Sequence, residues 1–135
     1  MHYLRSKHRI FYYFLLFLPY FWMILMFYLG TIPGRDLPKF IFIKGMDKIF
    51  HASFYGILSS LFFLKYLYIN KYNILRAFVL SFIIGIGYGA FEETIQSFIP
   101  GRQSSIYDFF ADFSGIIISL SILSIYLEKK LLPQE

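Results

Sequence analysis

The stretch "FEETIQSFIPGRQSSIYDFFAD", residues 91–112, joins two long apolar segments through a short turn. Pro100 and Gly101 mark the turn, because this residue pair interrupts helices and favours a change of direction. Carboxylates flank the turn on both sides, and they are Glu92, Glu93, Asp108 and Asp112. The stretch therefore predicts a hairpin of two helices that carries acidic side chains near its tip.

The rest of the chain is equally apolar. Hydrophobic residues make up 58% of the 135 residues and charged residues 16%, with a mean hydropathy of +0.59, against about 45–50% and about 25% in soluble domains. Four apolar segments, 10–29, 46–68, 73–98 and 105–127, each have the roughly 20 residues that a helix needs to cross a bilayer. The sequence predicts an all-α integral membrane bundle of four transmembrane helices, forming a single domain over residues 1–135.

Basic residues indicate how this bundle is oriented, since Lys and Arg concentrate on the cytoplasmic side of membrane proteins. The two tails and the middle loop hold eight of them: Arg5, Lys7, Arg9, Lys65, Lys71, Arg76, Lys129 and Lys130. The opposite side holds five: Arg35, Lys39, Lys44, Lys48 and Arg102. We therefore expect a multi-pass protein with both termini in the cytoplasm.

Composition also argues against several functions. The net charge of +5 comes from basic residues scattered between apolar runs, so no nucleic-acid partner is expected. The absence of cysteine excludes disulfides and thiolate metal sites. No compact metal-binding spacing or phosphate-binding glycine loop occurs, so the sequence predicts neither a metal site nor a cofactor.

Polar residues of three predicted helices fall at one depth. At about 1.5 Å per residue, they lie within ~10 Å of the outer ends of their segments. Within each segment they are spaced three or four apart, so each set shares one helical face. The residues at this depth are Asp47, Lys48 and His51, then Glu93 and Gln96, then Asp108 and Asp112, and the shared face in the first of these segments is that of Asp47, His51 and Tyr55. Glu92 lies ~100° from Glu93 around the helix, and we leave it out of the set.

Small residues accompany these faces at four-residue spacing, which favours close helix contact in membranes. They are Ala52, Gly56 and Ser60, Gly85 and Gly89, and Ala111, Gly115 and Ser119. Charged side chains that face lipid are costly unless they are paired or hydrated. We therefore expect the polar faces to meet in a shared pocket open toward the outer leaflet.

Two motifs in this region resemble those of a known family. The segment "DKIFHASFYGIL" (47–58) fits a D-K-x-x-H-x-x-x-Y pattern. The segment "EETIQSFIPGRQSSIYDFFADFSG" (92–115) fits E-x-x-Q, then P-G-R, then D-x-x-x-N-x-x-G. Together these segments, which cover about half of the chain, resemble the VanZ-like family of small bacterial membrane proteins.

The resemblance implies a location in the bacterial cytoplasmic membrane. It also implies a link to teicoplanin resistance, with which the founding member of the family is associated. It implies that the residues that matter are Asp47, Lys48, His51, Tyr55, Glu93, Gln96, Arg102, Asp108 and Gly115. Asp112 stands where the family usually has asparagine. This extra acid requires either a compensating cation or a carboxyl group that keeps its proton.

These polar residues are compatible with three different functions. The polar pocket binds an amphiphilic envelope component, either a membrane lipid or a lipid-linked precursor, with Lys48 and Arg102 as anion-binding groups. Alternatively, it is the active site of a membrane-embedded hydrolase or transferase that acts on a lipid phosphate, with His51 or Glu93 as the group that moves the proton. In the third alternative, the polar residues only fix helix packing.

Structural roles compete with these functions at several positions. Lys48 and Arg102 also fit side chains that extend to the membrane interface. Glu93 and Gln96 also fit hydrogen bonds that lock two helices together. Ser105 and Asp108 fit a capping box at the start of the fourth helix. The sequence leaves the ligand and the oligomeric state undetermined.

Overall fold

The computed structural model describes residues 2–38, 45–102 and 105–131, with backbone only for residues 2–11 and 131. Its long helices are α1 (His2–Gly30), α2 (Met46–Ile69), α3 (Ile74–Gln96) and α4 (Ile106–Leu131), and a short 3-10 helix spans Gly34–Asp36. All four long helices are long and apolar enough to cross a membrane. The prediction of an all-α bundle with four membrane-spanning helices is confirmed.

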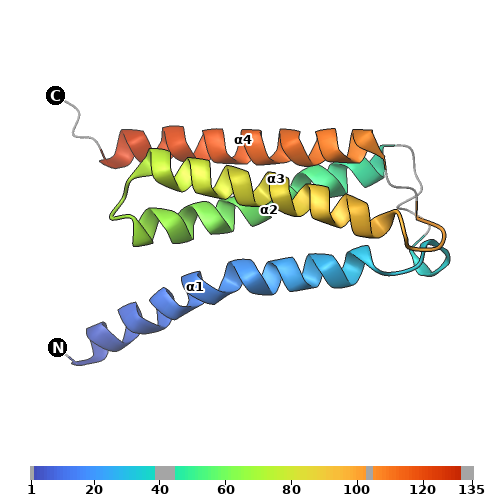
Figure 1. Cartoon of the computed structure of the whole chain (residues 1–135). Helices are drawn as coiled ribbons and strands as arrows, with labels where there is room; N and C mark the ends of the chain where they lie inside the picture. The colour runs from blue at the N-terminus through green and yellow to red at the C-terminus, as the bar shows by residue number, and fades with distance from the viewer. Residues whose placement is uncertain (1, 39–44, 103–104, 132–135) are drawn as a thin grey trace.

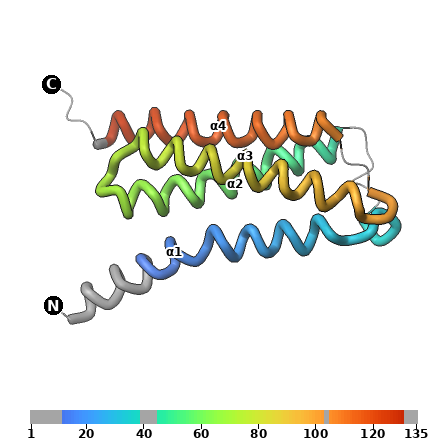
Figure 2. Tube along the Cα trace, viewed as in Figure 1, coloured from blue at the N-terminus to red at the C-terminus, as the bar shows by residue number. Residues whose placement is uncertain are grey.

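The helices form two consecutive hairpins. Figure 1 shows the start of α1 and the end of α4 at one end of the bundle, together with the α2–α3 turn. The α1–α2 and α3–α4 connections lie at the opposite end, as the trace in Figure 2 also shows. We call this second end the loop end. Helix α2 packs against each of the other three helices, so residues on several of its faces are buried.

Helices α2 and α4 approach each other closely at their small residues. A Cβ atom added to Gly115 would lie 2.0 Å from the carbonyl oxygen of Ala52, and one added to Gly56 would lie 3.2 Å from the carbonyl oxygen of Gly115. Only glycine permits such contact between backbones, as in other membrane helix pairs. The prediction that small residues bring the helices together is confirmed at this crossing.

Helix α1 is attached to the bundle by polar contacts as well as by apolar packing. The indole nitrogen of Trp22 donates a hydrogen bond to the carbonyl oxygen of Phe54 on α2 at 3.1 Å. The hydroxyl group of Tyr88 on α3 donates to the carbonyl oxygen of Met23 at 2.7 Å. These bonds fix the rotation of α1 relative to α2 and α3.

Lys65 does not lie in the middle loop, where it was predicted. It lies within α2, is 6% exposed, and its ammonium group donates to the hydroxyl oxygen of Tyr20 at 2.5 Å. The same ammonium group lies 4.1 Å from the centre of the Tyr20 ring, a favourable cation–π contact. Of the other cations used to predict orientation, Lys39 and Lys44 lie outside the described residues.

Candidate functional site

The predicted polar residues of α2, α3 and α4 meet at the loop end of the bundle. We call this group, together with Glu92, the polar layer. Its members are Asp47, Lys48, His51, Tyr55, Glu92, Glu93, Gln96, Asp108 and Asp112. Its contacts, described below, join residues that are up to 61 positions apart in the sequence. The predicted convergence at one depth is therefore confirmed, with one additional acid.

Lys48 links the first turns of α2 and α4. Its ammonium nitrogen lies 2.5 Å from Oδ1 of Asp108 and 2.6 Å from Oδ2 of Asp47. The side chains of Lys48 and Asp47 are 37% and 39% exposed, whereas that of Asp108 is only 7% exposed. Lys48 therefore compensates a buried charge while part of its side chain stays accessible.

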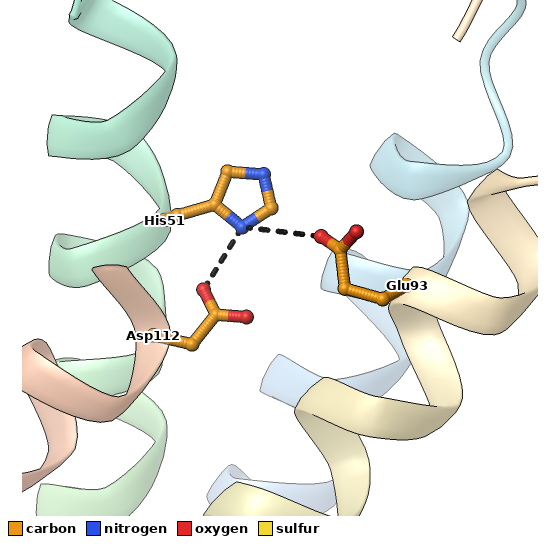
Figure 3. A group of neighbouring side chains, drawn as sticks. All are labelled: His51, Glu93 and Asp112. Carbon is orange, nitrogen blue, oxygen red and sulfur yellow. Dashed lines mark hydrogen bonds and ion pairs between the residues drawn. The ribbon is translucent and has the colours of Figure 1, made fainter. Parts of the chain in front are cut away.

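His51 lies between carboxylates from two other helices. Its Nδ1 atom is 2.9 Å from Oδ1 of Asp112 and 3.9 Å from Oε1 of Glu93, and Figure 3 shows all three side chains pointing toward one another. When Nδ1 carries the hydrogen, it donates to Asp112 and the carboxylate orients the imidazole ring. Such an oriented ring has the geometry that a general acid or base requires.

Glu92 belongs to the polar layer, contrary to the prediction from helix geometry. Its side chain is buried, and its Oε2 atom accepts a short hydrogen bond from the hydroxyl group of Tyr55. A Cβ atom at Gly30, the last residue of α1, would lie 3.0 Å from Oε1 of Glu92. The prediction failed because α3 is covered on two adjacent faces. Helices α2 and α4 lie beside Glu93, and α1 together with Tyr55 of α2 lies beside Glu92.

Gln96 occupies the same α1–α3 contact one turn later. It is buried, and its amide nitrogen would lie 3.4 Å from a Cβ atom at Gly30. Gly30 therefore allows the end of α1 to cover both Glu92 and Gln96. A signal for this role was present in the sequence, because a glycine, Gly30, directly follows the first apolar segment.

In place of the two hydrogen bonds of the predicted capping box between Ser105 and Asp108, Ser105 bonds to Tyr107 and to Glu93. The hydroxyl oxygen of Ser105 accepts a hydrogen bond from the backbone N–H of Tyr107 at 3.2 Å, as a helix N-cap does. The backbone N–H of Ser105, however, donates to Oε2 of Glu93 at 3.2 Å. The carboxylate that completes the cap thus comes from α3, because Asp108 is engaged with Lys48.

Arg102 lies in the α3–α4 connection and binds the end of α1. Its Nε and Nη2 atoms donate to the carbonyl oxygens of Ile32 at 3.1 Å and Leu29 at 2.6 Å. Burial lowers the pKa of the guanidinium group, and the nearby acids Glu92 and Glu93 act in the opposite direction. Arginine remains charged even so. These two backbone contacts occupy Nε and Nη2, and the anion-binding role predicted for Arg102 together with Lys48 stays a prediction.

Burial increases from one side of the polar layer to the other. Asp47 and Lys48 are partly exposed, the His51 side chain is 17% exposed, and Asp112 is completely buried. A bound molecule would therefore meet the cation of Lys48 before the imidazole of His51. The accessible edge of the layer thus carries an ammonium group that is paired with Asp47 and Asp108, and the oriented imidazole lies behind it.

Neither a known protein family, nor a curated protein, nor a solved structure matches this chain. What the structure establishes is an all-helical bundle with four helices able to cross a membrane. Function must therefore be argued from the polar layer itself.

Proposed function

We propose that this chain is a VanZ-like multi-pass protein of the bacterial cytoplasmic membrane that binds an amphiphilic envelope component at the polar layer. In this proposal the ligand is a membrane lipid or a lipid-linked envelope precursor with an anionic phosphate group. Binding changes the susceptibility of the cell to envelope-targeting antibiotics of the glycopeptide type. The observation that carries the proposal is the partly exposed Lys48 at the edge of a buried layer of charged groups from three helices.

The two motifs that resemble the family support this proposal. The Lys48, His51 and Tyr55 side chains of the first motif contact acids from the second motif region, namely Asp108, Asp112 and Glu92. Spatial contact between the motifs is what a common binding site requires. The phosphate of an outer-leaflet lipid also has the charge that Lys48 attracts.

The proposed ligand requires the loop end to face outward. The start of α1 and the end of α4 lie at the opposite end of the bundle (Figure 1), and the basic residues of the tails favour a cytoplasmic location for them. With this orientation, the polar layer lies just below the outer membrane surface. It would then be accessible to envelope precursors on that side.

Single cysteines provide a direct test of orientation, because the natural chain has none. We expect Arg35→Cys, at a highly exposed position of the loop end, to react in intact cells with a thiol reagent that does not cross membranes. Lys71→Cys, at the exposed α2–α3 turn, should react only after the cells are permeabilised. The opposite labelling pattern would place the polar layer at the cytoplasmic side and exclude this proposal.

Ligand binding is tested with the purified protein and two phosphate-bearing probes, a short-chain phosphatidylglycerol and a short polyprenyl phosphate. We expect Lys48→Gln to weaken binding by about 10-fold or more, because a charge-assisted hydrogen bond contributes ~1.5–3 kcal/mol. His51→Ala should weaken it as well. The two probes distinguish a membrane lipid from a lipid-linked precursor by which of them binds more tightly.

Arg35→Gln is the matched control, since it removes a cation at the same end that is exposed and lies outside the polar layer. It should leave binding and antibiotic susceptibility unchanged. If Lys48→Gln and His51→Ala insert and fold normally yet leave both properties at the wild-type level, the polar layer is not a ligand site. A loss of function that only parallels a loss of stability would assign the layer to helix packing.

One observation favours a second candidate, a membrane-embedded hydrolase or transferase acting on a lipid phosphate or lipid-linked precursor. The 2.9 Å contact between Asp112 and Nδ1 of His51 orients an imidazole ring beside Glu93. In this reaction His51 or Glu93 would move a proton while Lys48 holds the anion. Product formed from either phosphate probe, and lost in Glu93→Gln, would distinguish catalysis from binding alone.

A further inference from the structure

The cluster of His51, Glu93 and Asp112 has the composition of a metal site. Each residue offers one ligand atom, and these atoms lie within 4.8 Å of one another. They come from α2, α3 and α4, and Figure 3 shows them converging on one point between the helices. Donors of one ion at about 2.1 Å lie roughly 3.0–3.4 Å apart, so small side-chain rotations would complete the geometry.

Asp112 provides an independent indication that the cluster can hold a cation. Its side chain is completely buried, and within the described part of the chain its Oδ2 atom has no hydrogen-bond partner. Oδ2 lies toward α3, 3.3 Å from where a Cβ atom of Gly89 would be, one turn before Glu93. Buried carboxylate oxygens are normally paired with a donor or a metal, so this oxygen is available as a ligand.

The charge balance of the polar layer points in the same direction. Five carboxylates lie in it, from Asp47, Glu92, Glu93, Asp108 and Asp112. Lys48 is already shared between Asp47 and Asp108. A divalent cation at His51, Glu93 and Asp112 would compensate the buried acids that Lys48 does not reach.

We infer that His51, Glu93 and Asp112 form a binding site for a divalent first-row transition-metal ion of the Zn²⁺ or Mn²⁺ type. One imidazole nitrogen with two carboxylates suits these ions, whereas Ca²⁺ takes six to eight oxygen ligands and Mg²⁺ keeps several waters. Nδ1 of His51 would bind the ion, with the ring hydrogen on Nε2, which points away from the two acids in Figure 3. Three protein ligands leave a coordination position open.

This inference rests on the cluster alone and does not require the proposed lipid ligand. Its test uses the full-length protein, purified in detergent, treated with a chelator and titrated with Co²⁺, Zn²⁺, Mn²⁺, Mg²⁺ or Ca²⁺. Co²⁺ is the spectroscopic probe, because its visible absorption reports on its ligands. We expect one Co²⁺ per chain, displacement of Co²⁺ by Zn²⁺, and no competition from Mg²⁺ or Ca²⁺ at equal concentration.

The variants His51→Ala, Glu93→Gln and Asp112→Asn should each lower Co²⁺ affinity by at least about 10-fold and change the absorption spectrum. Glu93→Gln and Asp112→Asn keep the size of the side chain, so they test the ligands even if His51→Ala fails to fold. Asp36→Asn, which removes an exposed acid at the same end, should bind Co²⁺ like the wild type. Absence of Co²⁺ and Zn²⁺ binding, or equal binding by all variants, would overturn the inference.

Discussion

Gly115→Ala is expected to destabilise the bundle by about 3 kcal/mol or more. The added methyl group would lie 2.0 Å from the carbonyl oxygen of Ala52, which belongs to the backbone of α2. A side chain could rotate away, but a helix backbone must move as a whole, and overpacking of a tight contact typically costs about 1–3 kcal/mol and occasionally more. The measurement is the thermal unfolding midpoint in detergent, followed by circular dichroism.

Gly87→Ala is the matched control for this substitution. Gly87 also lies inside a helix, but nothing lies within 4 Å of its added Cβ atom. Alanine favours helix formation over glycine by ~0.8–1.0 kcal/mol, so this variant should be as stable as the wild type or slightly more stable. Equal unfolding midpoints for the two variants would show that α2 and α4 do not touch at Gly115.

Lys48→Met is expected to cost about 2–4 kcal/mol of stability. The substitution keeps the apolar part of the side chain but leaves Asp108, whose side chain is 7% exposed, without its cation. Breaking a fully buried ion pair costs about 3–5 kcal/mol. The expected value is lower here because the Lys48 side chain is 37% exposed, and solvent screens part of the interaction.

Two further variants separate this effect from a general loss of charge. Asp108→Asn added to Lys48→Met removes the uncompensated acid and should recover a large part of the lost stability, as a double-mutant cycle would show. Arg35→Met breaks the exposed ion pair with Asp36 at 3.5 Å and should change stability by less than about 0.5 kcal/mol. Additive effects of the substitutions at Lys48 and Asp108 would contradict the ion pair.

Hydropathy and spacing were sufficient to predict the fold and the depth of the polar layer. Long apolar runs require helices in a membrane, and the predicted ends of α2 and α3 and the start of α4 lie within two residues of the observed ones, whereas α4 ends at Leu131 instead of 127. The start of α1 was misjudged by more, because it begins at His2 and includes basic residues that hydropathy excludes. Periodicity also placed His51, Glu93 and Asp112 on faces that meet.

Hydropathy and spacing did not predict which side chains of the polar layer would bond to one another. Periodicity identifies one face of a helix, so it missed Glu92, whose face is buried by α1 and by Tyr55 of α2. Local motifs assume near neighbours, so the capping box assigned Asp108 to a bond that Glu93 makes from another helix. A metal site was not predicted for the same reason, since the three side chains that could hold an ion come from three helices and have no compact spacing in the sequence.

The first helix carries no motif residue, yet it is bound to the α3–α4 connection, which carries the motif residue Arg102. The N–H group of Gly34, just beyond α1, donates to the carbonyl oxygen of Pro100 at 3.1 Å, and Arg102 holds the carbonyl groups of Leu29 and Ile32. A hydrophobic segment that served only as a tether could be exchanged for any other of equal length. Here such an exchange would remove the cover over Glu92 and Gln96, so the first helix is a working part of the polar layer and not a replaceable anchor.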